Sequence, residues 1–169
     1  LWKQFYYMRK LTFLLLLVFA SCSSSNDDEA SVDNTSYTIW KGSNISFTKT
    51  EGSDPNEANN QDRMTSNVWI TRGNNGGQIY NIVKENSSTK TSSPAGTKWA
   101  RGTIDQLSSL TFTSFTTAVV KSTDILGKNF VMYLEEDKIY LSVKFTAWSS
   151  GAGNGQGGGG GFAYQRSTK

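Results

Sequence analysis

The apolar residues of this chain recur at every second position from Tyr37 onward, and this period limits the possible folds more than any other feature of the sequence. The clearest case is NFVMYLEEDKIYLSVKFTAW, from Asn129 to Trp148. Because successive side chains on a strand point to opposite faces, the run predicts two strands joined by a polar turn, with Ala147 and Trp148 on opposite faces and either of the two exposed. The residues expected on the buried face are Phe130, Met132, Leu134, Ile139, Leu141, Val143, Phe145 and Ala147.

The same alternation predicts several shorter strands, in which β-branched and aromatic residues dominate and which turn residues separate. No segment after Tyr37 shows a helical stripe, although GTIDQLSSL is long enough to hold a short helix. We therefore expect an all-β domain over residues 37–169, an antiparallel β-sandwich with a jelly-roll-like arrangement. The pairs expected to share a face are Ile45 with Phe47, Val68 with Ile70, Leu110 with Phe112, and Phe162 with Tyr164.

Residues 1–21 have the order of a secretory signal peptide. Met8-Arg9-Lys10 supplies a positively charged start, Leu11 to Phe19 supplies an apolar run, and the small residues Ala20-Ser21 precede Cys22. A transmembrane helix needs about 20 apolar residues, roughly twice the length of this run. We expect residues 1–21 to be removed and Met8 to be the true first residue.

The Ala20-Ser21-Cys22 junction resembles the lipobox of bacterial lipoproteins, with Phe19 in place of the usual leucine. The resemblance implies that Cys22 carries a diacylglycerol and begins a mature protein anchored in the outer membrane. Several acyl chains, at about 0.8 kcal/mol per buried methylene, make such an anchor effectively permanent. The alternative is an ordinary buried free cysteine.

Residues 22–36 are expected to form a disordered tether, because serine, asparagine and acidic residues there cannot bury enough apolar surface to offset the entropy of ordering. Asp27, Asp28 and Glu29 resemble the acidic export signal of surface-exposed lipoproteins in some Gram-negative bacteria. This resemblance implies display on the cell surface. A merely solvated spacer on a periplasm-facing anchor is the alternative.

The charge balance argues against nucleic acid as a partner. The chain has 17 basic and 14 acidic residues, but three basic residues and no acidic one precede Cys22, so the remainder is neutral. Histidine is absent and cysteine occurs once, which excludes Ser-His-Asp and Cys-His catalysis, Cys/His zinc sites and internal disulfides. Only carboxylate, lysine, tyrosine or Ser-Lys chemistry is left for an enzyme.

An oxygen-rich loop, TEGSDPNEANNQDRMTS, has the inventory of a calcium site. Calcium takes six to eight hard oxygen ligands from a pliable loop. The spacing is not that of an EF-hand, and the alternative is a solvated loop with Asx turns. The candidate calcium ligands are Asp54, Asn56, Glu57, Asn60 and Asp62.

Tryptophan is frequent in the predicted domain. Flat aromatic rings on the face of a β-sandwich hold sugar rings, while neighbouring polar side chains bond to the hydroxyls. The same rings are also ordinary components of β-sheet cores. The candidate ligand-binding residues are Trp40, Trp69, Trp99 and Trp148.

Enzymatic function is not favoured by the acidic residues. A glycoside hydrolase needs two carboxylates about 5 Å or about 6.5–9.5 Å apart in a cleft. Asp62, Glu85 and Asp105 lie near predicted strand ends but are not marked as a pair, and the acids of the hairpin tip, residues 135–137, are expected to be solvated. The glycine-rich SSGAGNGQGGGGG lacks the Lys-Ser/Thr of a phosphate loop and is expected to be a flexible joint between the last two strands.

Four blocks of the chain resemble a recurrent, uncharacterised β-rich domain of secreted bacterial proteins: SDPNEANNQDRMTSNVWITRGNNGGQIYNIVKE, SSPAGTKWARGT, KIYLSVKFTAWSSG and GGGFAYQRST. The pattern has an isoleucine where Met64 stands and a glutamate where Lys98 stands. The resemblance implies a secreted β-sandwich and no catalytic residues.

These features favour a surface-anchored bacterial lipoprotein whose β-sandwich serves adhesion or glycan binding. Two alternatives stay open, a structural or accessory subunit of an envelope complex and a carboxylate-based glycan hydrolase. The expected partners are the membrane, through the lipid anchor, and either a glycan or an envelope protein, and calcium is the one cofactor considered.

Overall fold

The structure is a computed structural model that describes residues 36–120, 124–151 and 159–169. The predicted signal peptide over residues 1–21, the lipidation site Cys22, the tether up to residue 35 and residues 152–158 of the glycine-rich joint lie outside the described residues. The helical turns are η1 (Ala58–Asn60), η2 (Ile104–Ser109) and α1 (Phe115–Val119). The strands are β1 (Thr38–Trp40), β2 (Ile45–Lys49), β3 (Asp62–Arg63), β4 (Trp69–Gly73), β5 (Gly76–Asn81), β6 (Thr97–Arg101), β7 (Asn129–Leu134), β8 (Ile139–Trp148) and β9 (Phe162–Arg166).

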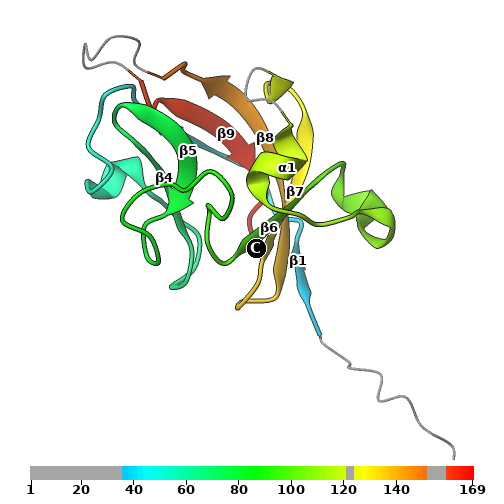
Figure 1. Ribbon diagram of the computed structural model, residues 1–169. Helices are drawn as coiled ribbons and strands as arrows, with labels where there is room; N and C mark the ends of the chain where they lie inside the picture. The colour runs from blue at the N-terminus through cyan, green and yellow to red at the C-terminus, as the bar shows by residue number, and fades with distance from the viewer. Residues whose placement is uncertain (1–35, 121–123, 152–158) are drawn as a thin grey trace, which may run out of the picture. The chain divides into compact units, whose positions relative to one another are not determined.

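The strands form two sheets (Figure 1). The larger sheet has the order β2-β9-β8-β7-β6, and β1 runs parallel to the first residues of β8. The smaller sheet has the order β3-β4-β5, and every other strand pair is antiparallel. The predicted all-β, antiparallel sandwich is therefore confirmed.

Strands β7 and β8 form the hairpin that the alternation predicts. Leu134 lies opposite Ile139, and the four residues between them make the turn. Leu141, Val143 and Phe145 of β8 are buried, whereas Lys144 between them is exposed. One face of the hairpin therefore contributes to the core and the other faces outward.

The end of β8 departs from strict alternation. Phe145 pairs with Tyr164 and Ala147 pairs with Ala163, so Thr146 is an extra residue in β8 that has no partner in β9. The register therefore shifts between Phe145 and Ala147. A β-bulge of this kind reverses the facing of every side chain beyond it. Ala147 is consequently exposed, and Trp148 packs against the core. The expectation that Ala147 shares the face of Phe145 is wrong, and Ala147, not Trp148, is the exposed member of this pair.

Both sheets and α1 contribute to one core. The ring of Phe115 in α1 lies 5.0 Å from Trp99 of β6 and 5.9 Å from Phe145 of β8, measured between ring centroids. Each such aromatic side chain contributes about 1.5–3 kcal/mol through burial. The smaller sheet contributes Ile70 of β4 and Ile79 of β5 to this core, and Val68, the residue before β4, joins them.

The segment LTFTSF is not the strand that its alternation predicts. It makes one isolated bridge, between Trp99 and Thr113, and Phe115 already belongs to α1. The side chain of Ser114 caps α1 by accepting a hydrogen bond from the backbone of Thr117, which stops the extended conformation there. The helix considered for GTIDQLSSL is present as the 3₁₀-helix η2.

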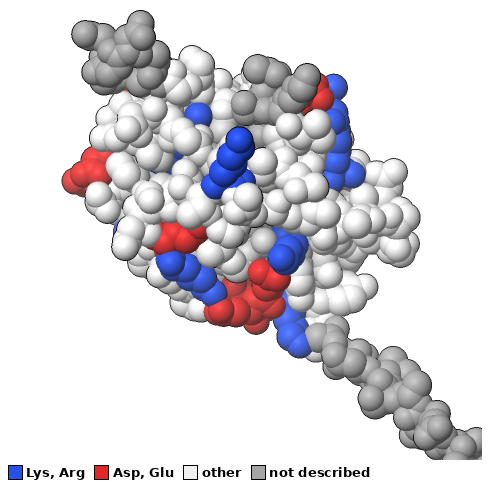
Figure 2. Space-filling model, in the orientation of Figure 1, with Lys and Arg blue, Asp and Glu red and all other residues white. Residues whose placement is uncertain are grey.

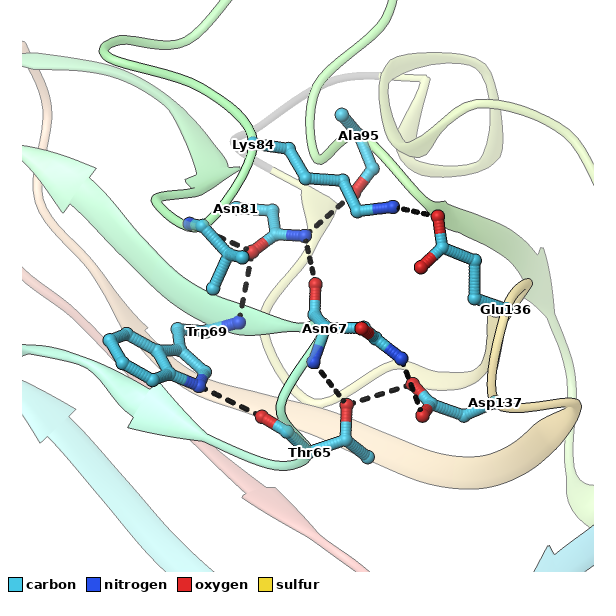
Figure 3. A network of polar contacts seen from close by, with 9 residues as sticks. Thr65, Asn67, Trp69, Asn81, Lys84, Ala95, Glu136 and Asp137 are labelled. Carbon is cyan, nitrogen blue, oxygen red and sulfur yellow. Dashed lines mark hydrogen bonds and ion pairs between the residues drawn. The ribbon is translucent and has the colours of Figure 1, made fainter.

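A polar network connects the beginning of the smaller sheet to the turn between β7 and β8 (Figure 3). Asp137 accepts one hydrogen bond from Thr65 Oγ1 at 2.8 Å and another from Asn67 Nδ2 at 2.9 Å. Beside it, Lys84 and Glu136 form an ion pair. Asp137 is therefore not a merely solvated hairpin residue, because it joins two segments that are far apart in the chain.

Asn81, at the end of β5, anchors the same network (Figure 3). Its Oδ1 accepts a hydrogen bond from the backbone N–H of Trp69 at 2.9 Å. Its Nδ2 donates to the carbonyl oxygens of Asn67 and Ala95 at 2.8 and 2.9 Å. A fully buried amide with these partners avoids the penalty of an unsatisfied polar group and rigidifies this end of the sandwich.

Candidate functional site

Strand β4 places an arginine on the inner face of the smaller sheet. Ile70 and Arg72 are two residues apart, so they share a face, and the side chain of Arg72 follows the buried apolar residues into the interior with an exposed fraction of 2%. Arg72 Nε donates to the carbonyl oxygen of Gly77 at 2.9 Å. Its Nη1 donates to the carbonyl oxygens of Gly161 at 2.8 Å and Ser149 at 3.0 Å.

The indole of Trp148 holds the same guanidinium from one side. The Cζ atom of Arg72 lies 3.9 Å from the centroid of the Trp148 ring. A guanidinium stacked on an aromatic ring gains roughly 0.5–2 kcal/mol and loses the freedom to rotate. The bulge in β8 makes this contact possible, because it turns Trp148 inward.

Arg72 and Trp148 line a pocket of about 380 Å³, here called the Arg72 pocket. Arg72 contributes only a small part of the pocket wall, because 2% of its surface is exposed. The remaining lining residues are Gly77, Gln78, Leu126, Ser150 and Gly151.

The glycine tract before β9 lies close to the backbone around Arg72. A Cβ atom at Gly160 would lie 1.6 Å from the carbonyl oxygen of Gly73, and Gly160 has a φ of +70°. Both observations require glycine at this position. The close approach brings the carbonyl of Gly161 to Arg72, so this end of the tract is part of the site and not only a joint.

The surroundings of Arg72 are electropositive. Burial lowers the pKa of Arg72 to about 10, while the charge of Glu51 acts in the opposite direction, so the guanidinium remains protonated at neutral pH. Lys49 of β2 is also buried, and its Nζ donates to the carbonyl oxygen of Ser53 at 2.8 Å. Burial and the neighbouring Arg72 both lower the pKa of Lys49, and Asp54 raises it. In the described part of the chain, neither cation forms an ion pair with a carboxylate.

The structure separates the four candidate tryptophans. Trp99 is fully buried and Trp40 is buried, so both rings belong to the core and leave the set of candidate ligand-binding residues. Trp69 is half-buried, and its Nε1 donates a hydrogen bond to the carbonyl oxygen of Thr65. The Cζ atom of Arg63 lies over its ring, 4.2 Å from the ring centroid. Trp148 alone of the four lines the Arg72 pocket.

The oxygen-rich loop is closed by its own hydrogen bonds. Asp54 Oδ1 accepts from the backbone N–H and from Nδ2 of Asn56, both at 2.9 Å, and Asn60 Nδ2 donates to the carbonyl oxygen of Asp54 at 2.7 Å. Glu57 is exposed. Among the residues that the structure describes, no group of three or more histidine, cysteine, aspartate or glutamate side chains could hold a metal ion.

Asp62 does not belong with that loop, because it is buried against β9. Its two carboxylate oxygens accept hydrogen bonds from Nε and Nη2 of Arg166 at 2.6 and 2.8 Å. Tyr164 donates its hydroxyl hydrogen to Oδ2 of the same carboxylate at 2.7 Å. These three contacts occupy Asp62, so it leaves both the predicted calcium set and the candidate catalytic acids.

The other two candidate catalytic acids, Glu85 and Asp105, do not form a hydrolytic pair with Asp62. Glu85 accepts hydrogen bonds from the backbone N–H groups of Asn81 and Ala95, both at 2.8 Å, and from the hydroxyl of Ser93. Asp105 is exposed. A carboxylate committed to backbone N–H groups, as Glu85 is, has a structural role, and this geometry does not favour the hydrolase alternative.

A second hollow, of about 450 Å³, lies on the outer side of the larger sheet and is here called the Tyr37 groove. Tyr133 and Tyr140 lie opposite each other on β7 and β8, with ring centroids 4.3 Å apart, and Phe112 packs against both. The hairpin register implies this tyrosine pair, which the sequence reasoning overlooked. Residues that line the groove include Tyr37, Ile39, Leu110, Phe112 and Tyr140.

Sequence reasoning also missed Arg72, Lys49 and Gln78. The available signal was alternation. Arg72 stands two residues after Ile70 in VWITRG, and Lys49 stands two residues after Phe47 in ISFTK, so each shares a face with an apolar residue. No local pattern marks Gln78, because the residues around it come from distant parts of the chain.

The surface gives no sign of a nucleic-acid interface on the face shown in Figure 2, where the described acidic and basic side chains are interspersed and most of the area is uncharged. No helix within residues 36–120, 124–151 and 159–169 is long and apolar enough to cross a membrane. Comparisons with protein-family models, curated proteins and solved structures found no match. Function must therefore be inferred from the site's own geometry.

Proposed function

We propose that this chain is a bacterial lipoprotein anchored in the outer membrane through Cys22 and displayed on the cell surface, where its β-sandwich binds a glycan. The order of charged, apolar and small residues before Cys22 supports lipidation. The polar tether after Cys22 would hold the domain away from the lipid. The acids at residues 27–29 support display on the outer face.

The observation that carries glycan binding is the Arg72 pocket. A sugar presents hydroxyl groups around its edge and C–H groups on its faces. The pocket offers the guanidinium of Arg72 and the amide of Gln78 to the hydroxyls, and the apolar surfaces of Trp148 and Leu126 to the C–H groups. Its volume of about 380 Å³ falls in the usual range for small-ligand sites.

The anchor is tested by expressing the full coding sequence in a Gram-negative host. Mass spectrometry of the purified protein should find Cys22 as an acylated first residue, and Cys22→Ser should release the protein from the membrane fraction. External protease should degrade the wild-type protein on intact cells. An unmodified Cys22 still joined to residues 1–21 would refute the anchor.

Glycan binding is tested with the purified full-length protein on a glycan array, followed by calorimetry with the best ligand. Gln78→Ala should weaken binding about two- to tenfold, because a lost hydrogen bond to an uncharged group costs about 0.5–1.5 kcal/mol. Tyr37→Ser is the control, because Tyr37 is 56% exposed and lines the Tyr37 groove, not the Arg72 pocket. This variant should bind the glycan like wild type. Binding to no glycan would reject the proposed function.

A further inference from the structure

We infer that the glycan bound in the Arg72 pocket carries a carboxylate, that is, an acidic sugar. This inference rests on the proposed function and specifies the ligand class of the same site. It starts from the charges buried in the sandwich and from the way in which Arg72 is held.

The interior of the described domain contains more positive than negative charge. Its buried charged side chains are Lys49, Asp62, Arg72 and Arg166. Asp62 and Arg166 neutralise each other through their ion pair. Lys49 and Arg72 have only carbonyl oxygens as hydrogen-bond acceptors. Burying a charge is costly unless an opposite charge accompanies it, so this pair of cations favours an anion in its vicinity.

The nearest acidic residues do not supply that anion. Glu51 and Asp54 influence the pKa values of Arg72 and Lys49 respectively, but both acids are exposed and neither pairs with these cations in the described structure. None of the described residues that line the pocket is acidic. The charge of Glu51 reaches Arg72, but Glu51 is not among these lining residues.

Arg72 is positioned to receive a carboxylate without rearrangement. Three carbonyl oxygens and the Trp148 ring hold Nε, Nη1 and the guanidinium plane, and the same side chain lines the pocket. Hydrogen bonds from a guanidinium to a carboxylate are about twice as strong as those between neutral groups. Because the donors are already in place, binding loses little side-chain entropy. Trp148 and Leu126 then contact the apolar face of the sugar ring.

The test changes the charge at the rim of the pocket without disturbing the core. Leu126 is 47% exposed, so Leu126→Glu and the nearly isosteric Leu126→Gln should both fold. The probes are oligosaccharides that contain galacturonate, glucuronate or sialic acid, each with its uncharged methyl ester, and short peptides with a free C-terminal carboxylate. Binding is measured by calorimetry on the full-length protein at low and high salt.

We expect at least one acidic oligosaccharide to bind about tenfold or more tightly than its methyl ester, with affinity falling as salt rises. Leu126→Glu should weaken that binding about tenfold relative to Leu126→Gln. Equal binding of acids and esters, or equal binding by the two Leu126 variants, overturns the acidic-ligand inference and leaves the proposed function standing. Binding of peptides alone also overturns it, whereas binding of no glycan of either kind rejects the proposed function itself.

Discussion

Two arginines are buried in the described sandwich, Arg72 and Arg166, and they differ in the groups that accept their hydrogen bonds. Arg166 of β9 donates two hydrogen bonds to the carboxylate of Asp62, which also accepts one from the hydroxyl of Tyr164. Arg72 of β4 meets three backbone carbonyls and the ring of Trp148. Both guanidiniums are nearly inaccessible to solvent.

Their protonation behaviour reflects this difference. Burial acts to lower the pKa of Arg166, but the hydrogen bonds and charge of Asp62 outweigh it, so the pKa is raised. Burial lowers the pKa of Arg72 to about 10, and the charge of Glu51 opposes this shift only in part. A buried arginine with its own counter-charge completes the core. Arg72 has no such ion pair in the described structure and lines a pocket, which is why we propose that it receives a charge from outside the chain.

The largest effect is expected from Asp62→Ala, which removes the carboxylate that pairs with Arg166. Arg166 would be left as an unpaired buried cation, and breaking such a pair costs about 3–5 kcal/mol of unfolding free energy. Urea unfolding at pH 7, followed by tryptophan fluorescence, measures this loss. The exposed Glu57→Ala serves as control and should change stability by no more than about 0.5 kcal/mol. A loss below about 1 kcal/mol for Asp62→Ala would contradict the structural role of the pair.

Arg72→Met should cost less, about 1–3 kcal/mol, because it leaves carbonyl groups without donors but leaves no charge unpaired. The same unfolding experiment ranks the two variants directly. If Arg72→Met proves more destabilising than Asp62→Ala, then Arg72 is chiefly a structural residue and the contrast between the two arginines fails.

Tyr164→Phe should cost about 1 kcal/mol at pH 7, since Asp62 keeps its bonds to Arg166. Burial, and next the charge of Asp62, raise the pKa of Tyr164 well above its ordinary value of 10.0. The folded protein therefore keeps this hydroxyl protonated where the unfolded chain ionises. The stabilisation is complete below about pH 10 and is lost as pH rises above it. Unfolding curves from pH 8 to 11.5 should fall more steeply for wild type than for Tyr164→Phe, and parallel curves would disprove the shift.

The smallest effect is expected from a chelator. A calcium site that used Asp62 would compete with Arg166 for the same oxygens, and calcium at 100 times its dissociation constant would add about 2.7 kcal/mol. We expect the thermal midpoint in EDTA to equal that in calcium. A reproducible rise of the midpoint with calcium would restore the oxygen-rich loop as a metal site.

The fold was predictable where burial alone decides the pattern. Leu141, Val143 and Phe145 alternate with polar residues over a whole strand, and the structure places them as this period requires. The pattern misled in LTFTSF, because the capping side chain of Ser114 starts α1 there and ends the extended segment. Alternation reports which side chains prefer burial and not whether a neighbouring strand is present to pair with.

The candidate site was less predictable, because its members come from distant parts of the chain. Asp62 reads as a calcium ligand beside Asn60, yet its partner Arg166 lies 104 residues away. Trp40 and Trp99 look like Trp148 in sequence, but only the assembled sheets decide which ring lines a pocket. Residue type indicated the chemistry, and long-range packing assigned the roles.

The Arg72 pocket depends on the number of residues near the end of β8, where the register shifts. Between Phe145 and Ala147 this strand has one residue more than β9 opposite it. The bulge holds Thr146 out of the ladder, so Ala147 pairs with Ala163 and Trp148 pairs with Phe162. Regular pairing of Thr146 with Ala163 would turn the indole of Trp148 to the outer surface, and the cavity would lose a wall while the sheet kept its order. One residue excluded from the ladder thus determines whether the Arg72 pocket has its aromatic wall.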